Sequence, residues 1–188
     1  MRKIQFRAGH YYHLYNRGVN RQPIFFHDEN WAYFIKRLRH YCKPDLIDII
    51  AYCLMPNHYH FLVYLKDDNL SEKIMQPFTV SYTKAVNRQQ GRTGPVFQGP
   101  FKAKLVDKDE YLLHLSRYIH LNPVLAGRVE NPAKWVFSSY RDYVGLRNGT
   151  LPEPDVVLSQ FLSRQAYVEF VESYSKTDLK LIEHLILD

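Results

Sequence analysis

His58 and His60 flank one aromatic residue in the segment 55–63, MPNHYHFLV. Residues i and i+2 of a β-strand project from the same face, so this spacing predicts two imidazoles side by side on one face of a strand. Imidazole nitrogens commonly bind divalent metals, and a neighbouring pair supplies half of such a site. A complete site needs further ligands and a group for the metal to activate.

A polar stripe recurs in the segment 109–122, whose apolar residues stand at the three- and four-residue intervals of an amphipathic helix. His114, Tyr118 and Asn122 follow one another four residues apart and lie beside the apolar stripe. In one interpretation this is a partly exposed face, where Tyr118 packs its ring and Asn122 caps the helix. The helix should end there, because the residue before Pro123 disfavours the α conformation.

In the functional interpretation, the side-chain oxygen of Asn122 joins His58 and His60 around one cation. Tyr118, one helical turn away, then presents its phenol to a substrate on that metal. A free tyrosine has a pKa near ~10 and needs a nearby cation or base to act as a nucleophile at neutral pH. Imidazole with amide oxygen suits Mg²⁺ or Mn²⁺ better than Zn²⁺, and either ion would polarise a phosphate. The pattern alone leaves both interpretations open.

The composition is that of a globular protein of one domain: 188 residues, 46% hydrophobic and 23% charged. Lys and Arg outnumber Asp and Glu by 25 to 19, and the pI is near 9.2. This excess of positive charge favours a polyanionic partner such as nucleic acid. Aromatic residues reach 15% and suit stacking on unpaired bases, although most are expected in the core.

Several classes of protein are excluded by features that the sequence lacks. Cys42 and Cys53 are the only cysteines, so we expect two reduced thiols and no disulfide framework. No run approaches the ~18 apolar residues that cross a bilayer, and no apolar signal-peptide core follows the basic segment 1–7. A GxxxxGK[ST] loop is absent, so we expect no nucleotide cofactor. We therefore expect a cytoplasmic protein without membrane association.

Strand-like and helix-like segments alternate along residues 1–144 in the order β-α-β-β-α-β, followed by a further helix. This order predicts an α+β, ferredoxin-like sandwich with an antiparallel sheet. Residues 145–188 are predicted to form a C-terminal extension packed on the same domain. The predicted strands are 10–16, 45–54, 58–65 and 96–106, and the predicted helices are 29–41, 69 to about 90, 107–121, 158–174 and 178–187.

Four motifs follow one another along residues 1–144. They are YYHLYNRGVNRQPIF at 11–25, PNHYHFLV at 56–63, RYIHLNPVLAG at 117–127 and WVFSSY at 135–140. Together they resemble the single-tyrosine HUH transposases, specifically the REP-associated tyrosine transposase branch. A lone His-x-His pair occurs widely, whereas four motifs in register are specific.

The resemblance implies a role for each matched residue. His58 and His60 match the paired histidines of the HUH motif, and Asn122 matches the third metal ligand, which is commonly Gln or Asn. Tyr118 matches the nucleophilic tyrosine. The loop after the first strand lies near bound DNA in similar proteins, and its matching residues here are Asn16, Arg17 and Arg21.

The activity implied by the resemblance is metal-dependent cleavage of single-stranded DNA beside a hairpin, with Mg²⁺ or Mn²⁺ as the cofactor. Tyr118 would form a 5′-phosphotyrosine link and release a 3′-hydroxyl, and the reverse attack would rejoin strands. A monomer is favoured, with a homodimer as the alternative. Four further basic residues are expected to follow the phosphates, although each would equally suit a solvated face: Arg88, Arg92, Lys102 and Lys104.

Two other functions compete with this one. A different His-x-His phosphoesterase is the first, but a histidine-triad hydrolase would have a third histidine where Leu62 stands, and barrel metallohydrolases need ~250 residues. The second is a non-catalytic, ferredoxin-like domain that binds single-stranded nucleic acid by aromatic stacking. A protein–DNA adduct that survives denaturation would distinguish the enzyme from the binding protein.

Overall fold

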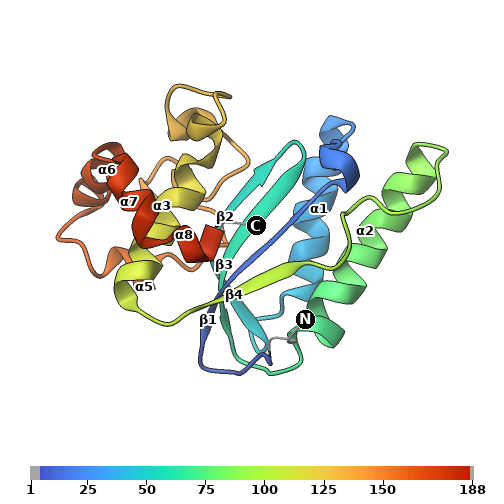
Figure 1. Ribbon diagram of the computed structural model, residues 1–188, viewed down its shortest axis with the longest axis horizontal. Helices are drawn as coiled ribbons and strands as arrows, with labels where there is room; N and C mark the ends of the chain where they lie inside the picture. The colour runs from blue at the N-terminus through green and yellow to red at the C-terminus, as the bar shows by residue number, and fades with distance from the viewer. Residues whose placement is uncertain (1–4, 187–188) are drawn as a thin grey trace.

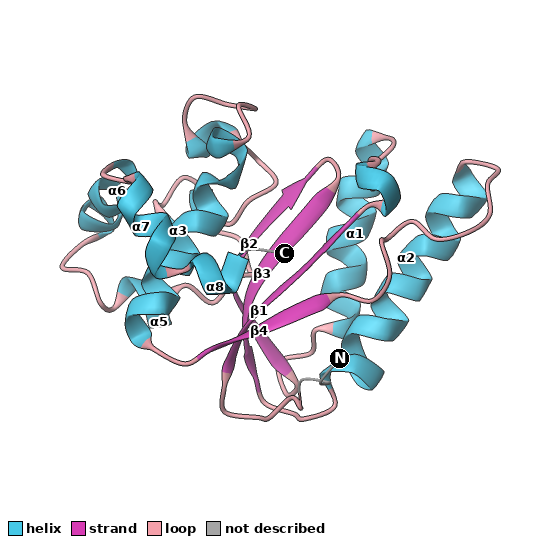
Figure 2. Ribbon diagram, in the orientation of Figure 1, coloured by secondary structure: helices cyan, strands magenta, loops and turns pink. Residues whose placement is uncertain are grey.

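An antiparallel sheet of four strands separates two groups of helices in the computed structural model, which describes residues 5–186 (Figures 1 and 2). The strand order across the sheet is β2-β3-β1-β4, and every neighbouring pair is antiparallel. The strands are β1 (Tyr11–Arg17), β2 (Ile47–Met55), β3 (His58–Leu65) and β4 (Lys102–Val106).

Helices α1 (Asp28–Tyr41) and α2 (Gln76–Gln89) cover one face of the sheet, and α3 (Asp109–Leu125) covers the other (Figure 1). A π-helical turn, Leu70–Met75, leads into α2. The chain therefore runs β1-α1-β2-β3-α2-β4-α3. The predicted α+β fold with an antiparallel sheet is confirmed.

Strand β3 sorts its side chains between the two groups of helices, because successive residues of a strand point to opposite faces. Tyr59 and Phe61 are fully buried in the core beneath α1 and α2, while Leu62 belongs to the core beneath α3. His58 and His60 share the face of Leu62. The two imidazoles therefore face α3.

Helix α3 continues past the point where the sequence predicted its end. It runs through Pro123 to Leu125, and the amide of Ala126 still donates to the carbonyl of Asn122 at 3.0 Å. A proline inside a helix removes one hydrogen bond and crowds the preceding turn. Asn122 and Pro123 are buried against the rest of the protein, and this packing offsets that cost.

The fourth strand is shorter than the sequence predicted. Residues 96–101 are irregular apart from a single bridge between Gly18 and Phe97, and β4 begins only at Lys102. Gly99 has a left-handed φ of 75°, and Pro100 has no N–H to give to a neighbouring strand. Gly99 and Pro100 therefore explain why β4 does not begin before Lys102.

The C-terminal region forms four short helices in place of the predicted two, and the predicted helix 178–187 extends one residue beyond the described range. Ser163 begins a new helix within the predicted segment 158–174, because its hydroxyl accepts from the amide of Ala166. The remaining helical elements are Val19–Arg21, Pro132–Lys134, α4 (Tyr140–Tyr143), α5 (Asp155–Leu158), α6 (Arg164–Glu172), α7 (Lys176–Leu181) and α8 (Glu183–Ile186).

Arg117 attaches this C-terminal region to α3. Its side chain is 3% exposed, and Nη2 lies 2.6 Å from Oδ1 of Asp178 in α7. Nη1 donates to the carbonyl of Phe170 in α6 at 2.9 Å, and the guanidinium lies 4.1 Å from the centre of that ring. The region thus packs on the helix that carries Tyr118. Among the described residues, no helix is long and apolar enough to cross a membrane.

We expect Asp178→Asn to lower the free energy of unfolding by about 1–3 kcal/mol, because it leaves the buried guanidinium of Arg117 without a charged partner. Glu130→Gln is the matched control. Glu130 is 90% exposed in its pair with Lys134, so we expect a change within about 0.5 kcal/mol. Urea denaturation measures both, and equal effects would contradict a structural role for the Arg117–Asp178 pair.

Candidate active site

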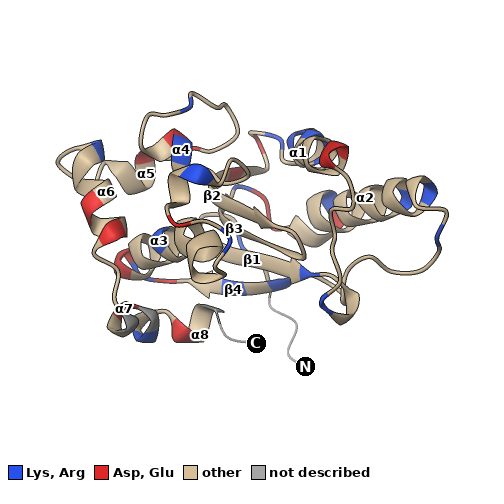
Figure 3. Ribbon diagram, turned by 90° about the horizontal axis from the view of Figure 1, so that it is seen from above, with Lys and Arg blue, Asp and Glu red and all other residues tan. Residues whose placement is uncertain are grey.

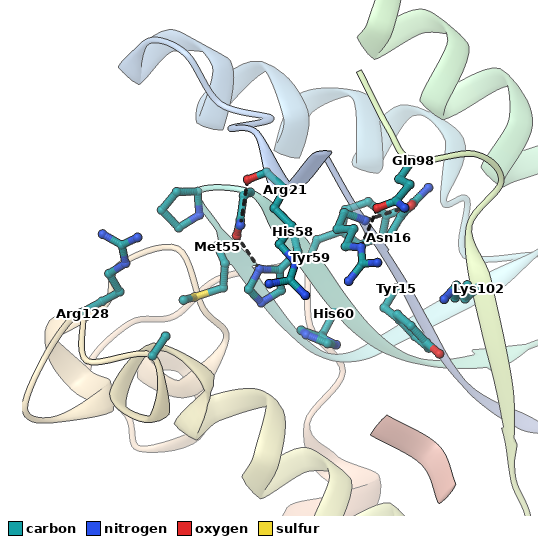
Figure 4. A pocket seen from close by; sticks show the side chains of 14 residues that line it. Tyr15, Asn16, Arg21, Met55, His58, Tyr59, His60, Gln98, Lys102 and Arg128 are labelled. Atoms are coloured by element: carbon teal, nitrogen blue, oxygen red, sulfur yellow. Dashed lines mark hydrogen bonds between the residues drawn. The ribbon is translucent and has the colours of Figure 1, made fainter. Parts of the chain in front are cut away.

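A cavity of about 450 Å³ opens where the ends of β1 and β3 meet the C-terminal end of α3 (Figure 4). His58 and His60 both line it from β3, and Tyr15 lines it from β1 (Figure 4). Polar and basic groups complete the wall: Asn16, Arg17, Arg21, Asn57, Gln98, Lys102 and Arg128. The cavity thus combines imidazole nitrogens with cationic side chains.

His58 meets Asn122 across the boundary between sheet and helix. Nε2 of His58 lies 2.9 Å from Oδ1 of Asn122, 64 residues away in the sequence. The predicted ligands from β3 and α3 therefore come together. Ligands on adjacent corners of an octahedral Mg²⁺ site, with bonds of about 2.1 Å, lie about 3 Å apart. The observed separation fits two ligands of one such cation.

The other nitrogen of His58 has its own partner. Nδ1 lies 2.7 Å from Oδ1 of Asn57, whose amide nitrogen in turn donates to the carbonyl of Arg21 at 3.2 Å. Because that donation orients the Asn57 amide, its oxygen accepts from Nδ1–H of His58. Burial lowers the pKa of His58, opposed by the hydrogen bond to Asn122 and assisted by the charge of Arg17. Both ring nitrogens of His58 thus face amide oxygens, and a neutral imidazole can donate to only one of them. A cation held between Nε2 and Oδ1 of Asn122 would take the place of the second proton.

His60 is held by a second histidine. Its Nδ1 lies 2.9 Å from Nε2 of His13 in β1, and Nδ1 of His13 lies 2.8 Å from the carbonyl oxygen of Leu185. Burial lowers the pKa of His60 well below its usual value, and positive charge on His13 or His58 would lower it further. The imidazole is therefore neutral at physiological pH, which is the state that binds metal.

Tyr118 lies on α3 one turn before Asn122, as the sequence predicted. Its ring is half-buried and packs edge-on against His60, with 5.6 Å between the ring centroids. The next residue but one, His120, is fully buried and bonds Tyr167 and Ser139 at 2.7 and 2.8 Å. His114, the third member of the predicted stripe, accepts from Arg117 instead of joining the site.

The donor set suits a cation that takes nitrogen and oxygen ligands. Two imidazoles and one amide oxygen leave the remaining octahedral positions to water and phosphate oxygens. Within residues 5–186, no three His, Cys, Asp or Glu side chains are grouped to hold a metal. A site of this kind therefore depends on the amide of Asn122 as its third ligand.

The predicted DNA-binding residues divide into two groups. Asn16, Arg17, Arg21 and Lys102 line the cavity, with Arg17 donating to Gln98 at 2.7 Å. The others are outside its lining. Arg88 lies at the exposed C-terminal end of α2, Arg92 donates to the carbonyl of Pro95 in the next loop, and Lys104 follows Lys102 on the same face of β4.

Figure 3 shows how charge is distributed around these elements. Lys and Arg mark the end of β1 and part of β4, whereas Asp and Glu recur on α6, α7 and α8 (Figure 3). The C-terminal end of α2 lies at the same end of the sheet as the β2–β3 turn (Figure 1). Arg88 therefore lies near that end of the sheet, whereas Lys104 pairs with His13 near the middle of β1.

Several residues that line or support the cavity were not predicted as site residues from the sequence, among them His13, Tyr15, Asn57, Gln98 and Arg128. His13 and Tyr15 stand two apart on β1, so the strand alternation that singled out His58 and His60 carried the same signal. Gln98 and Arg128 come from irregular segments, and no local pattern could place them beside β3.

The match to known proteins agrees with this geometry. The family model described as "Transposase IS200 like" matches residues 7–122, a segment that includes all four predicted metal-binding and catalytic residues. This chain belongs to the IS200-like transposase family. The single-tyrosine transposase family predicted from the motifs is thereby confirmed.

Two proteins named as REP-associated tyrosine transposases are similar to this IS200-like transposase. A protein of Haemophilus influenzae named as a REP-associated tyrosine transposase is 32% identical over 109 residues, 53% of this chain and 62% of that protein. The chain thus matches less than two thirds of that relative's length. A REP-associated tyrosine transposase solved bound to a REP hairpin has the same fold, with a TM-score of 0.64, 21% identity, and coverage of 77% of this chain and 85% of that one.

We expect Arg17→Ala in this IS200-like transposase to weaken hairpin-DNA binding and to reduce the slope of log K against log salt by about 1, because Arg17 lines the cavity and is predicted to contact a phosphate there. Arg88→Ala, outside the cavity, should change the slope less. Fluorescence anisotropy at several salt concentrations measures both. A larger loss for Arg88→Ala would mean that the DNA follows α2 instead of the cavity.

Proposed function

We propose that this protein cleaves and rejoins single-stranded DNA beside a REP-like hairpin, with Tyr118 as the nucleophile and Mg²⁺ or Mn²⁺ as the cofactor. The observation that carries the proposal is the approach of Nε2 of His58 to Oδ1 of Asn122 at 2.9 Å, beside the edge-on contact of Tyr118 with His60. Family membership supports the reaction class, and the hairpin bound by the structural relative supports the substrate class.

The reaction follows from the nucleophile. The phenol oxygen of Tyr118 loses its proton and attacks the phosphorus of a phosphodiester, and the bond from phosphorus to the 3′-oxygen breaks. The 3′-oxygen leaves with a proton as a hydroxyl, and the 5′-phosphate stays on Tyr118. A 3′-hydroxyl that attacks this ester reverses the step and rejoins a strand. Because the ester keeps the bond energy, no nucleotide cofactor is needed.

The metal would be held by His58, His60 and Asn122. When bound, it supplies positive charge that polarises the scissile phosphate and stabilises the charge growing on its oxygens. The protein contributes the orientation of the ligands through Asn57 and His13. It also keeps both imidazoles neutral by burying them.

The basic side chains that line the cavity support a path for a DNA backbone along its wall. Arg17, Arg21 and Lys102 line its wall, and Lys102 lies 6.0 Å from the centre of the Tyr15 ring. Arg21 sits in a left-handed conformation with φ of 58°, which costs roughly 1–2 kcal/mol in a non-glycine residue. The hydrogen bond from Asn57 to its carbonyl holds the backbone there. We propose that these residues, with Asn16, contact phosphates, and that Arg88, Arg92 and Lys104 extend the path.

A non-catalytic binding domain is the weaker candidate. Such domains expose aromatic rings on an open sheet face for bases to stack upon. Here Tyr12, Tyr59 and Phe61 are buried beneath α1 and α2, with exposed fractions of 2% or less.

The proposal also includes the domain division and the oligomeric state. We propose a transposase domain of residues 1–144, an extension of residues 145–188, and a monomer.

We expect Tyr118→Phe to abolish the covalent protein–DNA adduct while leaving hairpin binding unchanged, because only the attacking oxygen is removed. Labelled single-stranded hairpin DNA incubated with Mn²⁺ and analysed on a denaturing gel detects the adduct. Tyr15→Phe is the matched control, since the phenol of Tyr15 lines the cavity. An adduct that persists in Tyr118→Phe and disappears in Tyr15→Phe would assign the nucleophile to β1.

We expect Asn122→Ala to weaken Mn²⁺ binding at least about tenfold, because a ligand is lost from a site whose outer contacts alone are worth 10–100-fold. Electron paramagnetic resonance of free Mn²⁺ measures the affinity without any turnover. Asn131→Ala is the control, since that amide caps the turn Pro132–Lys134. Equal affinity in the wild type and Asn122→Ala would remove the amide from the ligand set.

A further inference from the structure

His13 lies fully buried between the candidate metal site and the C-terminal region. Nε2 faces Nδ1 of His60 at 2.9 Å, and Nδ1 faces the carbonyl oxygen of Leu185 in α8 at 2.8 Å. Leu185 and Ile182 are each 1% exposed, so this end of the chain packs firmly against the protein. Residues 172 positions apart in the sequence thus form one chain of hydrogen bonds.

The partners in this series of hydrogen bonds indicate which ring nitrogen of each histidine carries the proton. A carbonyl oxygen only accepts, so Nδ1 of His13 must carry the proton and donate to Leu185. In a neutral ring, Nε2 of His13 is then the acceptor, and Nδ1–H of His60 is the donor. His60 is left with an unprotonated Nε2, the nitrogen that can bind a metal.

The ring orientations agree with this assignment. The planes of His13 and His60 differ by 19°, and their centroids lie 5.1 Å apart while the facing nitrogens lie only 2.9 Å apart. The rings therefore meet edge to edge, as an N–H in the plane of a ring requires. A face-to-face stack would not bring two ring nitrogens together in this way.

We propose that His13 is a positioning residue for the metal ligand His60, and that the Leu185 carbonyl makes the C-terminal region part of the outer shell of the site. The inference rests on the proposed function. A histidine that binds metal through one nitrogen generally donates from the other to an oriented acceptor, which fixes its proton and its ring. Here that acceptor is itself fixed by the main chain of α8.

His58 and His60 have different acceptors for the proton on Nδ1. His58 donates to Asn57, which lies beside it in the β2–β3 turn, so that support is local in the sequence. His60 depends on a second strand and on the end of the chain. Loosening of α8 would therefore affect His60 and leave the contacts of His58 intact.

The first test needs no substitution. In ¹⁵N-labelled wild-type protein without metal, long-range ¹H–¹⁵N correlation spectra distinguish the two neutral forms of each imidazole. We expect His13 and His60 both to carry the proton on Nδ1. A proton on Nε2 of His60 would overturn the proposal.

The second test uses two substitutions of His13. Asparagine places its amide near the position of Nδ1, so His13→Asn keeps a donor for Leu185 but offers no acceptor to His60. Glutamine reaches the position of Nε2, so His13→Gln restores an acceptor for His60. We expect Mn²⁺ affinity to fall roughly 10–100-fold in His13→Asn and clearly less in His13→Gln. Equal losses in both variants would indicate a purely structural role.

Substitutions of the ligands themselves separate this inference from the proposed function. If His58→Ala and His60→Ala bind Mn²⁺ as the wild type does, the proposed metal site is wrong. If both lose Mn²⁺ while His13→Asn binds as tightly as the wild type, the site stands and the role of His13 is wrong. Thermal unfolding of each variant shows that the compared proteins are folded, and the spectra of the wild type decide the question if His13→Asn does not fold.

Discussion

The contact between Nε2 of His58 and Oδ1 of Asn122 joins the sheet to helix α3, and the geometry of the candidate site depends on it. It requires β3 to direct its histidines towards α3 and α3 to remain helical through Pro123. Strand alternation meets the first requirement without further support. The second needs packing energy, because the proline removes a hydrogen bond from the last turns of the helix.

Buried polar contacts hold α3 in its position. Arg117 reaches the carbonyl of Phe170 and the carboxylate of Asp178, and His120 bonds Tyr167 and Ser139. Burying a guanidinium or an imidazole is costly unless its hydrogen bonds are made, so each of these groups accepts few alternative arrangements. Both residues flank Tyr118 closely in the sequence. The phenol of Tyr118 therefore lies on a helix that the contacts of Arg117 and of His120 hold against rotation.

Burial has a second effect at the two proposed metal ligands. It lowers the pKa values of His58 and His60, so that both imidazoles stay neutral and available to a cation. To bind a cation, a neutral ring must still carry its proton on the nitrogen that faces away from that cation. Asn57 and His13 provide the acceptors that do this, one from a turn and one from the neighbouring strand. Burial keeps the two imidazoles neutral, and the hydrogen bonds decide which ring nitrogen carries the proton.

The local pattern of the sequence determined a large part of this protein. The His58-Tyr59-His60 alternation, the four-residue spacing of Tyr118 and Asn122, and the element order of the fold each follow from short-range periodicity, which the structure retains. Tertiary structure decided the rest. The continuation of α3 past Pro123, the delayed start of β4 and the joining of His13 to Leu185 depend on packing between distant segments. Propensity and periodicity describe only neighbours in sequence, so these long-range contacts were beyond their reach.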